Sequence, residues 1–159
     1  MDGVMSGRIA ARLAELGIEL PKPPKPVASY VPYVITGDLI FVSGQVPMTA
    51  DGLQFRGVVG DDFDVEEGQQ AARLCAINLL AQVADALGGD LDRVTRIVRL
   101  GGFVRCTAEF GQQPQVVNGA SDLMLEVFGN TGRHARAAVG VNALPAGVAV
   151  EVDAVVAFT

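Results

Sequence analysis

The chain has 159 residues, half of them hydrophobic and about a fifth charged, so it is long enough for one domain with its own core. Its 18 acidic and 12 basic residues give a net charge of −6, and the basic residues form no run. This is not the electrostatic pattern of a nucleic-acid-binding protein. One histidine and two cysteines without clustered spacing predict no metal site, and no apolar run approaches the roughly 20 residues of a transmembrane helix.

The N-terminal part of the chain is predicted to be a helix followed by a proline-rich connector. Apolar residues at helical spacing indicate a helix over 8–16, which Gly17 ends. The prolines of residues 21–26 indicate an extended strap, because proline fixes φ and removes backbone donors. We expect residues 1–28 to form an appendage of helix and strap, and residues 29–159 to form the single domain.

The start of the chain and the two cysteines bear on the cellular compartment. Residues 1–12 show no signal-peptide pattern, so we expect a cytosolic protein. In that reducing compartment Cys75 and Cys106 are expected to be free thiols. No base stands near Cys106 in the sequence, so an inert thiol is expected there.

Strands and helices alternate along the main part of the chain. A hairpin is expected to turn at Gly37 and Asp38, and a capping-box pattern of Asp64 and Glu67 begins the longest helix. The last strand alternates cleanly, with every second residue from Val150 on one face. The expected elements are strands over 30–36 and 39–45, a loop with an irregular strand over 48–62, a helix over 64–87, a strand over 94–105, a helix over 114–128, and strands over 135–141 and 148–158.

This order, ββ-α-β-α-ββ, predicts an α+β fold with one mixed sheet. Crossovers between parallel strands are right-handed, so both main helices should pack on the same face of the sheet. The opposite face still carries apolar residues from several strands, and such a face needs a cover. We therefore expect the protein to form an oligomer.

Two charged residues stand among apolar neighbours in the C-terminal strands. Arg136 is expected either to form a structural ion pair with Glu151 or Asp153, or to bind a ligand carboxylate with its planar fork. Glu151 is expected either at a solvated edge or in a cleft, where its pKa would rise and suit proton exchange. His134 is expected to be a loop histidine, and no phosphate-binding loop, dinucleotide fingerprint or nucleophile elbow is present.

Several segments together resemble the RidA/YjgF family. Residues 37–47 resemble its strand with Ser-Gly-Gln-x-Pro, and residues 134–139, 143–145 and 150–155 resemble its Ala-Arg…Leu-Pro…Ile-Glu-Ile-Glu-Ala signature. Residues 65–69 and 91–98 resemble the start of the family's first helix and the approach to its third strand.

The resemblance implies a chorismate-mutase-like (YjgF-like) fold and a homotrimer with a cleft at each subunit interface. It implies hydrolysis of enamine and imine intermediates, such as 2-aminoacrylate and 2-iminopropanoate, to 2-keto acids and ammonia without a cofactor. By this resemblance Arg136 binds the small substrate's carboxylate and Glu151 orients water. Tyr30, Ser43 and Gly44 line the cleft.

The sequence also departs from the family pattern. A cysteine two residues after the arginine is Ala138 here, a cleft asparagine is Ala108, and residues 111–119 resemble an insertion after Phe110. These changes resemble a longer-chain subgroup labelled endoribonuclease or of unknown function. A non-catalytic binder of small carboxylates therefore remains an alternative, whereas the acidic balance and the lack of an aromatic platform argue against a nuclease.

Overall fold

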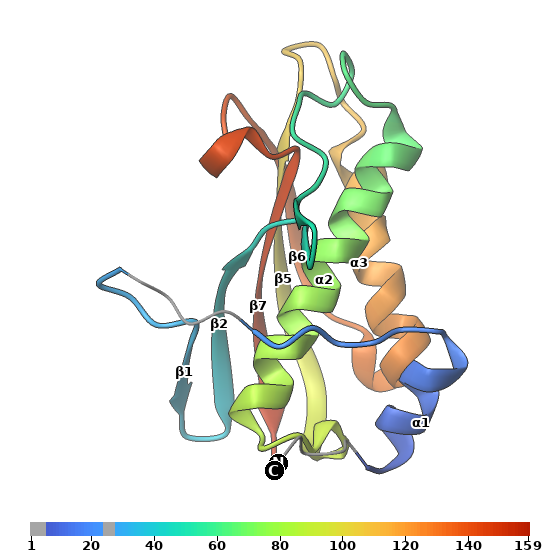
Figure 1. Cartoon of the computed structure of the whole chain (residues 1–159), viewed down its shortest axis with the longest axis vertical. Coiled ribbons are helices and arrows are strands. Elements are labelled where there is room, and N and C mark those ends of the chain that lie inside the picture. Colours follow the sequence, from blue (N-terminus) through green and yellow to red (C-terminus); the bar gives the residue numbers. More distant parts are fainter. Residues whose placement is uncertain (1–5, 24–27) are drawn as a thin grey trace.

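The computed structural model describes residues 6–23 and 28–159, and its centre is one five-stranded mixed sheet. The strand order is β1-β2-β7-β5-β6, with β5 and β6 parallel and the other neighbours antiparallel (Figure 1). The predicted α+β fold is confirmed. The strands are β1 (Tyr33–Thr36), β2 (Leu39–Gln45), β5 (Val94–Arg105), β6 (Ala135–Val141) and β7 (Val150–Phe158).

Some strand boundaries differ from those expected. The first strand begins at Tyr33 and not at residue 30, since Pro32 has no N–H to give to a neighbouring strand. In place of one irregular strand, the loop over 48–62 holds a small separate hairpin of β3 (Met48–Thr49) and β4 (Gly52–Leu53). The last strand begins at Val150, after a 3-10 turn over Pro145–Gly147.

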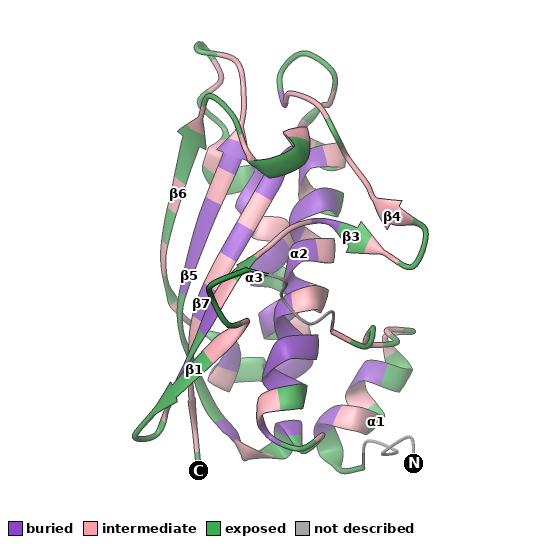
Figure 2. Ribbon diagram, turned by 60° about the vertical axis from the view of Figure 1, so that its left-hand side comes forward, coloured by how far each residue is buried: buried purple, intermediate pink, exposed green. Residues whose placement is uncertain are grey.

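Both main helices lie on one face of the sheet, as predicted (Figures 1 and 2). Helix α2 (Val65–Ala86) begins with the expected capping box, in which the Asp64 side chain accepts from the Glu67 N–H and the Glu67 carboxylate accepts from the Asp64 N–H. Helix α3 (Gln113–Phe128) carries proline in its first turn and ends at Gly129, whose φ of 62° suits glycine.

The helices approach the sheet and each other closely at two glycines. A Cβ atom on Gly102 of β5 would lie 2.5 Å from Cγ2 of Val117 on α3. A Cβ atom on Gly119 of α3 would collide with the backbone carbonyl of Gln69 on α2. These glycines let α3 pack tightly against both α2 and the sheet, which determines where its polar residues lie.

The N-terminal helix α1 (Arg8–Glu15) contributes to this packing. Ile9 and Leu13 are 1% and 2% exposed and belong to the same core as the sheet. The Asp92 carboxylate accepts from the backbone N–H groups of Ile9 and Arg8, at 2.8 and 2.9 Å, and these bonds lower the pKa of Asp92. A division of the chain after residue 28 stays a prediction, and residues 24–26 of the expected strap lie outside the described residues.

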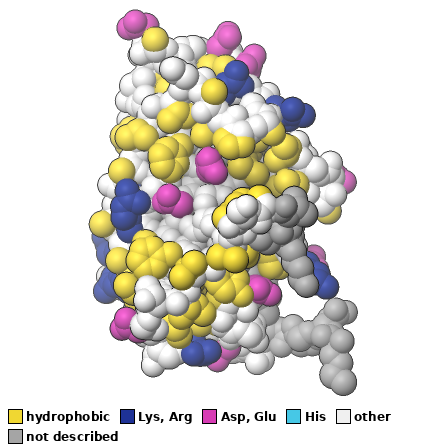
Figure 3. Space-filling model, turned by 90° about the vertical axis from the view of Figure 1, so that its left-hand side faces the viewer, with side chains coloured by type: hydrophobic (Ala, Val, Ile, Leu, Met, Phe, Trp, Pro, Cys, Tyr) yellow, Lys and Arg dark blue, Asp and Glu magenta, His cyan; other side chains and the backbone are white. Residues whose placement is uncertain are grey.

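The sheet face away from the helices is open and largely apolar. Val34, Phe41 and Val139 lie on it and are 52%, 46% and 45% exposed. Figure 3 shows hydrophobic side chains gathered on this side of the molecule around acidic side chains near its middle. The open face matches the apolar sheet face for which the sequence predicts a cover in an oligomer. In the described part of the chain, no helix combines the length and apolar character needed to cross a bilayer.

Candidate functional site

Glu151 lies on the open face of the sheet, near the start of β7, which is the central strand. Its register partner on β5 is Phe103, and its side chain is half-buried. Burial, and after it the negative charge of Asp153 on the same face, raise the pKa of Glu151 above its ordinary value. A half-buried carboxylate of this kind can exchange a proton at a pH closer to neutrality than an exposed glutamate.

A bulge in β2 places backbone directly beside this carboxylate. The register of β2 on β7 shifts between Val42 and Gln45, which leaves Ser43 and Gly44 as the irregular residues. A Cβ atom on Gly44 would lie 2.5 Å from Oε1 of Glu151, so any larger residue there would displace the carboxylate from this position. The resemblance identified Gly44 as a cleft residue, and this contact provides a physical reason for a glycine there.

Ser43 ties the bulge to the segment that precedes β1. Its hydroxyl donates to the Val31 carbonyl at 2.8 Å, and its backbone N–H donates to the Pro32 carbonyl at 2.9 Å. Tyr30 adjoins this segment and is 61% exposed. Ser43 and Gly44 therefore gather beside Glu151 on the open face, and Tyr30 stands in the chain that leads to them.

Arg136 lies on the opposite face of the sheet from Glu151. Its register partner on β5 is Leu100, which is fully buried against the helices. Glu151 pairs with Phe103, which follows Leu100 on β5 by an odd number of residues. Successive side chains of a strand alternate between faces, so the two charged groups point to opposite sides. They do not meet within one chain.

The Arg136 side chain is held by helix α3. Its Nη1 donates to Oδ1 of Asn118 at 2.8 Å and to Oγ of Ser121 at 3.1 Å. Across residues 6–23 and 28–159, no carboxylate lies within 4.0 Å of its guanidinium, and Asp153 instead pairs with Arg99 at 3.5 Å. The expected alternative of a structural ion pair with Glu151 or Asp153 is therefore wrong for the folded chain.

The hydrogen bonds of Arg136 leave part of its fork without a partner. Among the described residues Nε and Nη2 donate to no protein acceptor, and the side chain is half-buried. The edge formed by these two nitrogens matches the spacing of a carboxylate's oxygens. Arg136 is thus a charged group that protein atoms orient and that no acidic side chain of the described residues neutralises.

Asn118, Ser121 and His134 around Arg136 were not predicted as site residues. His134 accepts from or donates to Ser121 through Nε2 at 2.8 Å and meets the Gly132 carbonyl through Nδ1 at 2.7 Å. The signal that could have found them is the three-residue spacing of Asn118 and Ser121 on a predicted helix, combined with the register of β6. The register of β6 on β5 is visible only in the structure and cannot be read from the sequence.

The residues that depart from the family pattern lie partly beside Arg136 and partly elsewhere in the fold. Ala138 follows Arg136 by two residues and so shares its face of β6, whereas Ala108 lies in an exposed turn after β5. Residues 111–119, predicted as an insertion, form the approach to α3 and its first turns and so contribute Asn118. Neither cysteine is bonded to the other, and burial raises the pKa of Cys75 well above its usual range.

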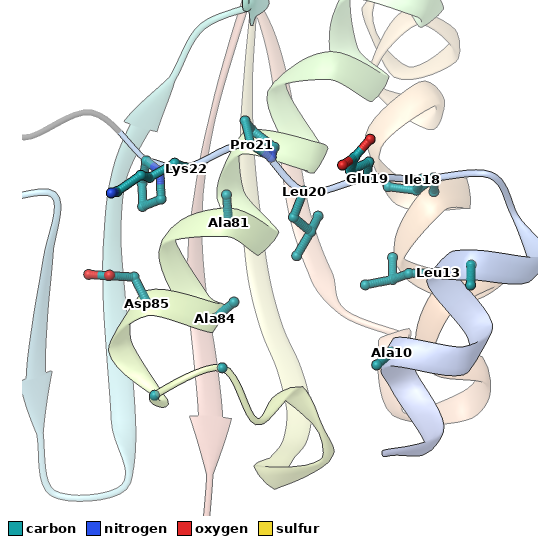
Figure 4. Close-up of a pocket in the computed structure, with 14 residues that line it drawn as sticks. Ala10, Leu13, Ile18, Glu19, Leu20, Pro21, Lys22, Ala81, Ala84 and Asp85 are labelled. Atoms are coloured by element: carbon teal, nitrogen blue, oxygen red, sulfur yellow. The ribbon is translucent and has the colours of Figure 1, made fainter. Parts of the chain in front are cut away.

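A cavity of about 830 Å³ lies elsewhere, between α1, residues 18–23 and α2. Figure 4 shows this segment crossing α2, with Leu20 and Leu13 pointing into the space between the two helices. None of the predicted site residues lines it. Within the described residues no group of three or more His, Cys, Asp or Glu side chains is suited to hold a metal ion.

The fold, the Ser-Gly bulge and the strand-borne arginine and glutamate define a YjgF-like α+β protein. The family described as "YjgF/chorismate mutase-like, putative endoribonuclease" matches residues 10–153. The chain therefore belongs to this family, which confirms its resemblance to RidA/YjgF proteins.

Individual relatives resemble the chain over nearly its whole length. It is 52% identical to "Protein TCP17" of Trypanosoma cruzi, covering 98% of both sequences. The crystal structure of Atu1372 from Agrobacterium tumefaciens, a protein of unknown function, is similar with a TM-score of 0.90 and 50% identity, covering 95% of this chain and 92% of that one. A "putative endoribonuclease" from Shewanella oneidensis MR-1 has a TM-score of 0.91 and 34% identity, covering 96% and 100%.

Proposed function

We propose that this protein hydrolyses reactive enamine and imine intermediates of the 2-aminoacrylate and 2-iminopropanoate type to 2-keto acids and ammonia. Arg136 binds the substrate carboxylate, Glu151 orients the attacking water, and Tyr30, Ser43 and Gly44 line the cleft. The observation that carries the proposal is the state of Arg136, which is oriented by α3 and has no acidic partner in the described residues. An arginine arranged in this way is suited to bind an external carboxylate.

In our proposal two subunits of a homotrimer build each cleft. Arg136 and Glu151 face opposite sides of the sheet, so one site can contain both only if they come from neighbouring chains. The open face around Glu151 carries exposed apolar side chains, and β6, the strand of Arg136, is an edge strand. Both features favour packing of one subunit's edge against another subunit's open face.

The proposed chemistry needs few groups. The Glu151 carboxylate takes a proton from water as the water oxygen bonds to the imine carbon, and the carbon–nitrogen π electrons move to nitrogen, which takes up a proton. The hydroxyl of the resulting carbinolamine then loses its proton as the carbon–oxygen double bond forms, and the carbon–nitrogen bond breaks with its electrons going to nitrogen, which takes up a proton and leaves as ammonia. One imine and one water thus give one 2-keto acid and one ammonia. Orientation of water and substrate can contribute several kcal/mol to lowering the barrier, and no cofactor takes part.

A coupled assay tests the activity directly. An amino-acid oxidase generates 2-iminopropanoate from alanine, and semicarbazide competes for the imine before it hydrolyses. We expect the wild-type protein to reduce semicarbazone formation and to accelerate release of pyruvate. If pyruvate release is not accelerated while pyruvate still binds at Arg136, the protein is instead a carboxylate-binding module, the alternative that the alanines at 108 and 138 leave open.

Subunit mixing tests whether the cleft is shared. Arg136→Ala and Glu151→Gln are each expected to be inactive alone. If they are unfolded together in equal amounts and refolded, about one quarter of the clefts should pair an intact arginine with an intact glutamate, since each occurs in half of the subunits. We expect about a quarter of the wild-type activity to return, whereas a site within one chain would recover none.

The endoribonuclease named in the family description is the weaker candidate. The chain is acidic, with a net charge of −6, and it has no tryptophan and only two tyrosines with which to stack bases. Cleavage of RNA by the purified protein that disappears with Arg136→Ala would favour this activity instead.

A further inference from the structure

A chain of hydrogen bonds runs from Arg136 through α3 to the loop before β6. Arg136 Nη1 lies 3.1 Å from Ser121 Oγ, Ser121 Oγ lies 2.8 Å from His134 Nε2, and His134 Nδ1 lies 2.7 Å from the Gly132 carbonyl oxygen. Asn118 supplies a second acceptor to the same Nη1 at 2.8 Å. All of these atoms belong to the helix-facing side of the sheet edge.

The direction of each hydrogen bond follows from the groups involved. The Gly132 carbonyl can only accept, so His134 Nδ1 carries a proton, and in the neutral ring Nε2 is the acceptor. The guanidinium can only donate, so the Ser121 oxygen accepts from Arg136 and its hydrogen goes to His134 Nε2. The three donors in this series, Arg136 Nη1, the Ser121 hydroxyl and His134 Nδ1, then each have an acceptor, and the bonds polarise one another in one direction.

This arrangement fixes the plane of the guanidinium. Asn118 and Ser121 stand one helical turn apart on α3, so the two bonds to Nη1 come from separated points. Ser121 is 8% exposed and its own position depends on His134, because a buried hydroxyl without an acceptor is costly. The His134 imidazole thereby holds Ser121 in place, and Ser121 holds the guanidinium of Arg136.

We propose that Ser121 and His134 are positioning residues for the Arg136 fork, keeping its Nε and Nη2 edge turned toward an incoming carboxylate. This inference rests on the proposed function, in which Arg136 binds the substrate carboxylate. It adds that the fork's orientation depends on the histidine two residues before it on the chain.

Binding of pyruvate, the expected product, separates this inference from the function on which it rests. We expect Ser121→Ala to weaken pyruvate binding about tenfold, because one hydrogen bond to a charged group is lost. Ser121→Thr, which keeps the hydroxyl, should stay within about threefold of the wild type, and Arg136→Ala should abolish binding. If Arg136→Ala binds pyruvate as the wild type does, the proposed function fails; if only Ser121→Ala is unchanged, the positioning role fails alone.

His134 also gives a direct readout, since it is the only histidine of the chain. In protein labelled with ¹⁵N-histidine at alkaline pH, we expect the Nδ1–H tautomer, with Nε2 as the acceptor. Saturating pyruvate should shift the Nε2 resonance of the wild type, and Ser121→Ala should abolish that response. An Nε2–H tautomer, or a wild-type histidine spectrum that pyruvate leaves unchanged, would overturn the inference without any variant having to fold.

Discussion

Replacing Arg136 with lysine is expected to lower kcat/KM for 2-iminopropanoate by at least about a hundredfold, although the charge is kept. Nη1 of the guanidinium donates to Asn118 and Ser121, and in the proposed function Nε and Nη2 together bind the substrate carboxylate. An ammonium group can satisfy the two acceptors on α3 or approach a carboxylate, but it cannot do both with a planar pair of donors. The coupled assay with semicarbazide measures this loss.

Arg133→Lys is the matched control for this variant. Arg133 stands three residues earlier in the same segment and is exposed, and among the described residues it forms hydrogen bonds through its backbone only: its carbonyl accepts from Arg96 and its N–H donates to the Asn130 carbonyl. The same substitution there should leave activity within about twofold, because surface changes away from special contacts have small effects. Undiminished turnover by Arg136→Lys, with both proteins folded, would show that Arg136 does not bind the substrate.

The local parts of the fold could be predicted from the sequence because their determinants are close together. The capping box joins Asp64 to Glu67, and the alternation of β7 from Val150 onward defines its buried face. The role of α1 could not be predicted in this way, since Asp92, which caps it, stands 84 residues from Arg8. Sequence spacing shows that the helix has an apolar side but not which surface receives that side.

The candidate site also has parts that the sequence predicts and parts that depend on contacts between distant residues. The motif resemblance identified Arg136, Glu151 and Gly44, and the bulge beside Glu151 accounts for the glycine physically. The face to which Arg136 points follows from the register of β6 on β5, which pairs residues far apart in the sequence, Leu100 with Arg136. For that reason the sequence left an ion pair with Glu151 open, whereas the two residues point to opposite sides of the sheet.

The second large effect is expected at Glu151. Glu151→Gln should reduce the maximal rate about a hundredfold to a thousandfold, since the amide cannot take a proton from water. The variant should be no less stable than the wild type at pH 8. The raised pKa of Glu151 means that the folded chain holds this proton more tightly than the unfolded chain, so its ionised form opposes folding at pH values above that pKa. A thermal unfolding midpoint that does not fall would separate lost chemistry from lost structure.

The pH profile gives the sharper version of this prediction. Glu151 must be ionised to accept a proton, so activity should fall as the pH drops through its pKa, which burial and then Asp153 raise. Asp153→Asn removes the like charge and leaves Arg99 without its acidic partner at 3.5 Å, and both changes favour ionised Glu151. The acid limb of kcat/KM should therefore move to lower pH while the burial contribution remains, and Asp122→Asn on exposed α3 surface should leave it in place. An acid limb that Asp153→Asn leaves unmoved or shifts upward would mean that Glu151 is not the group whose ionisation controls the reaction.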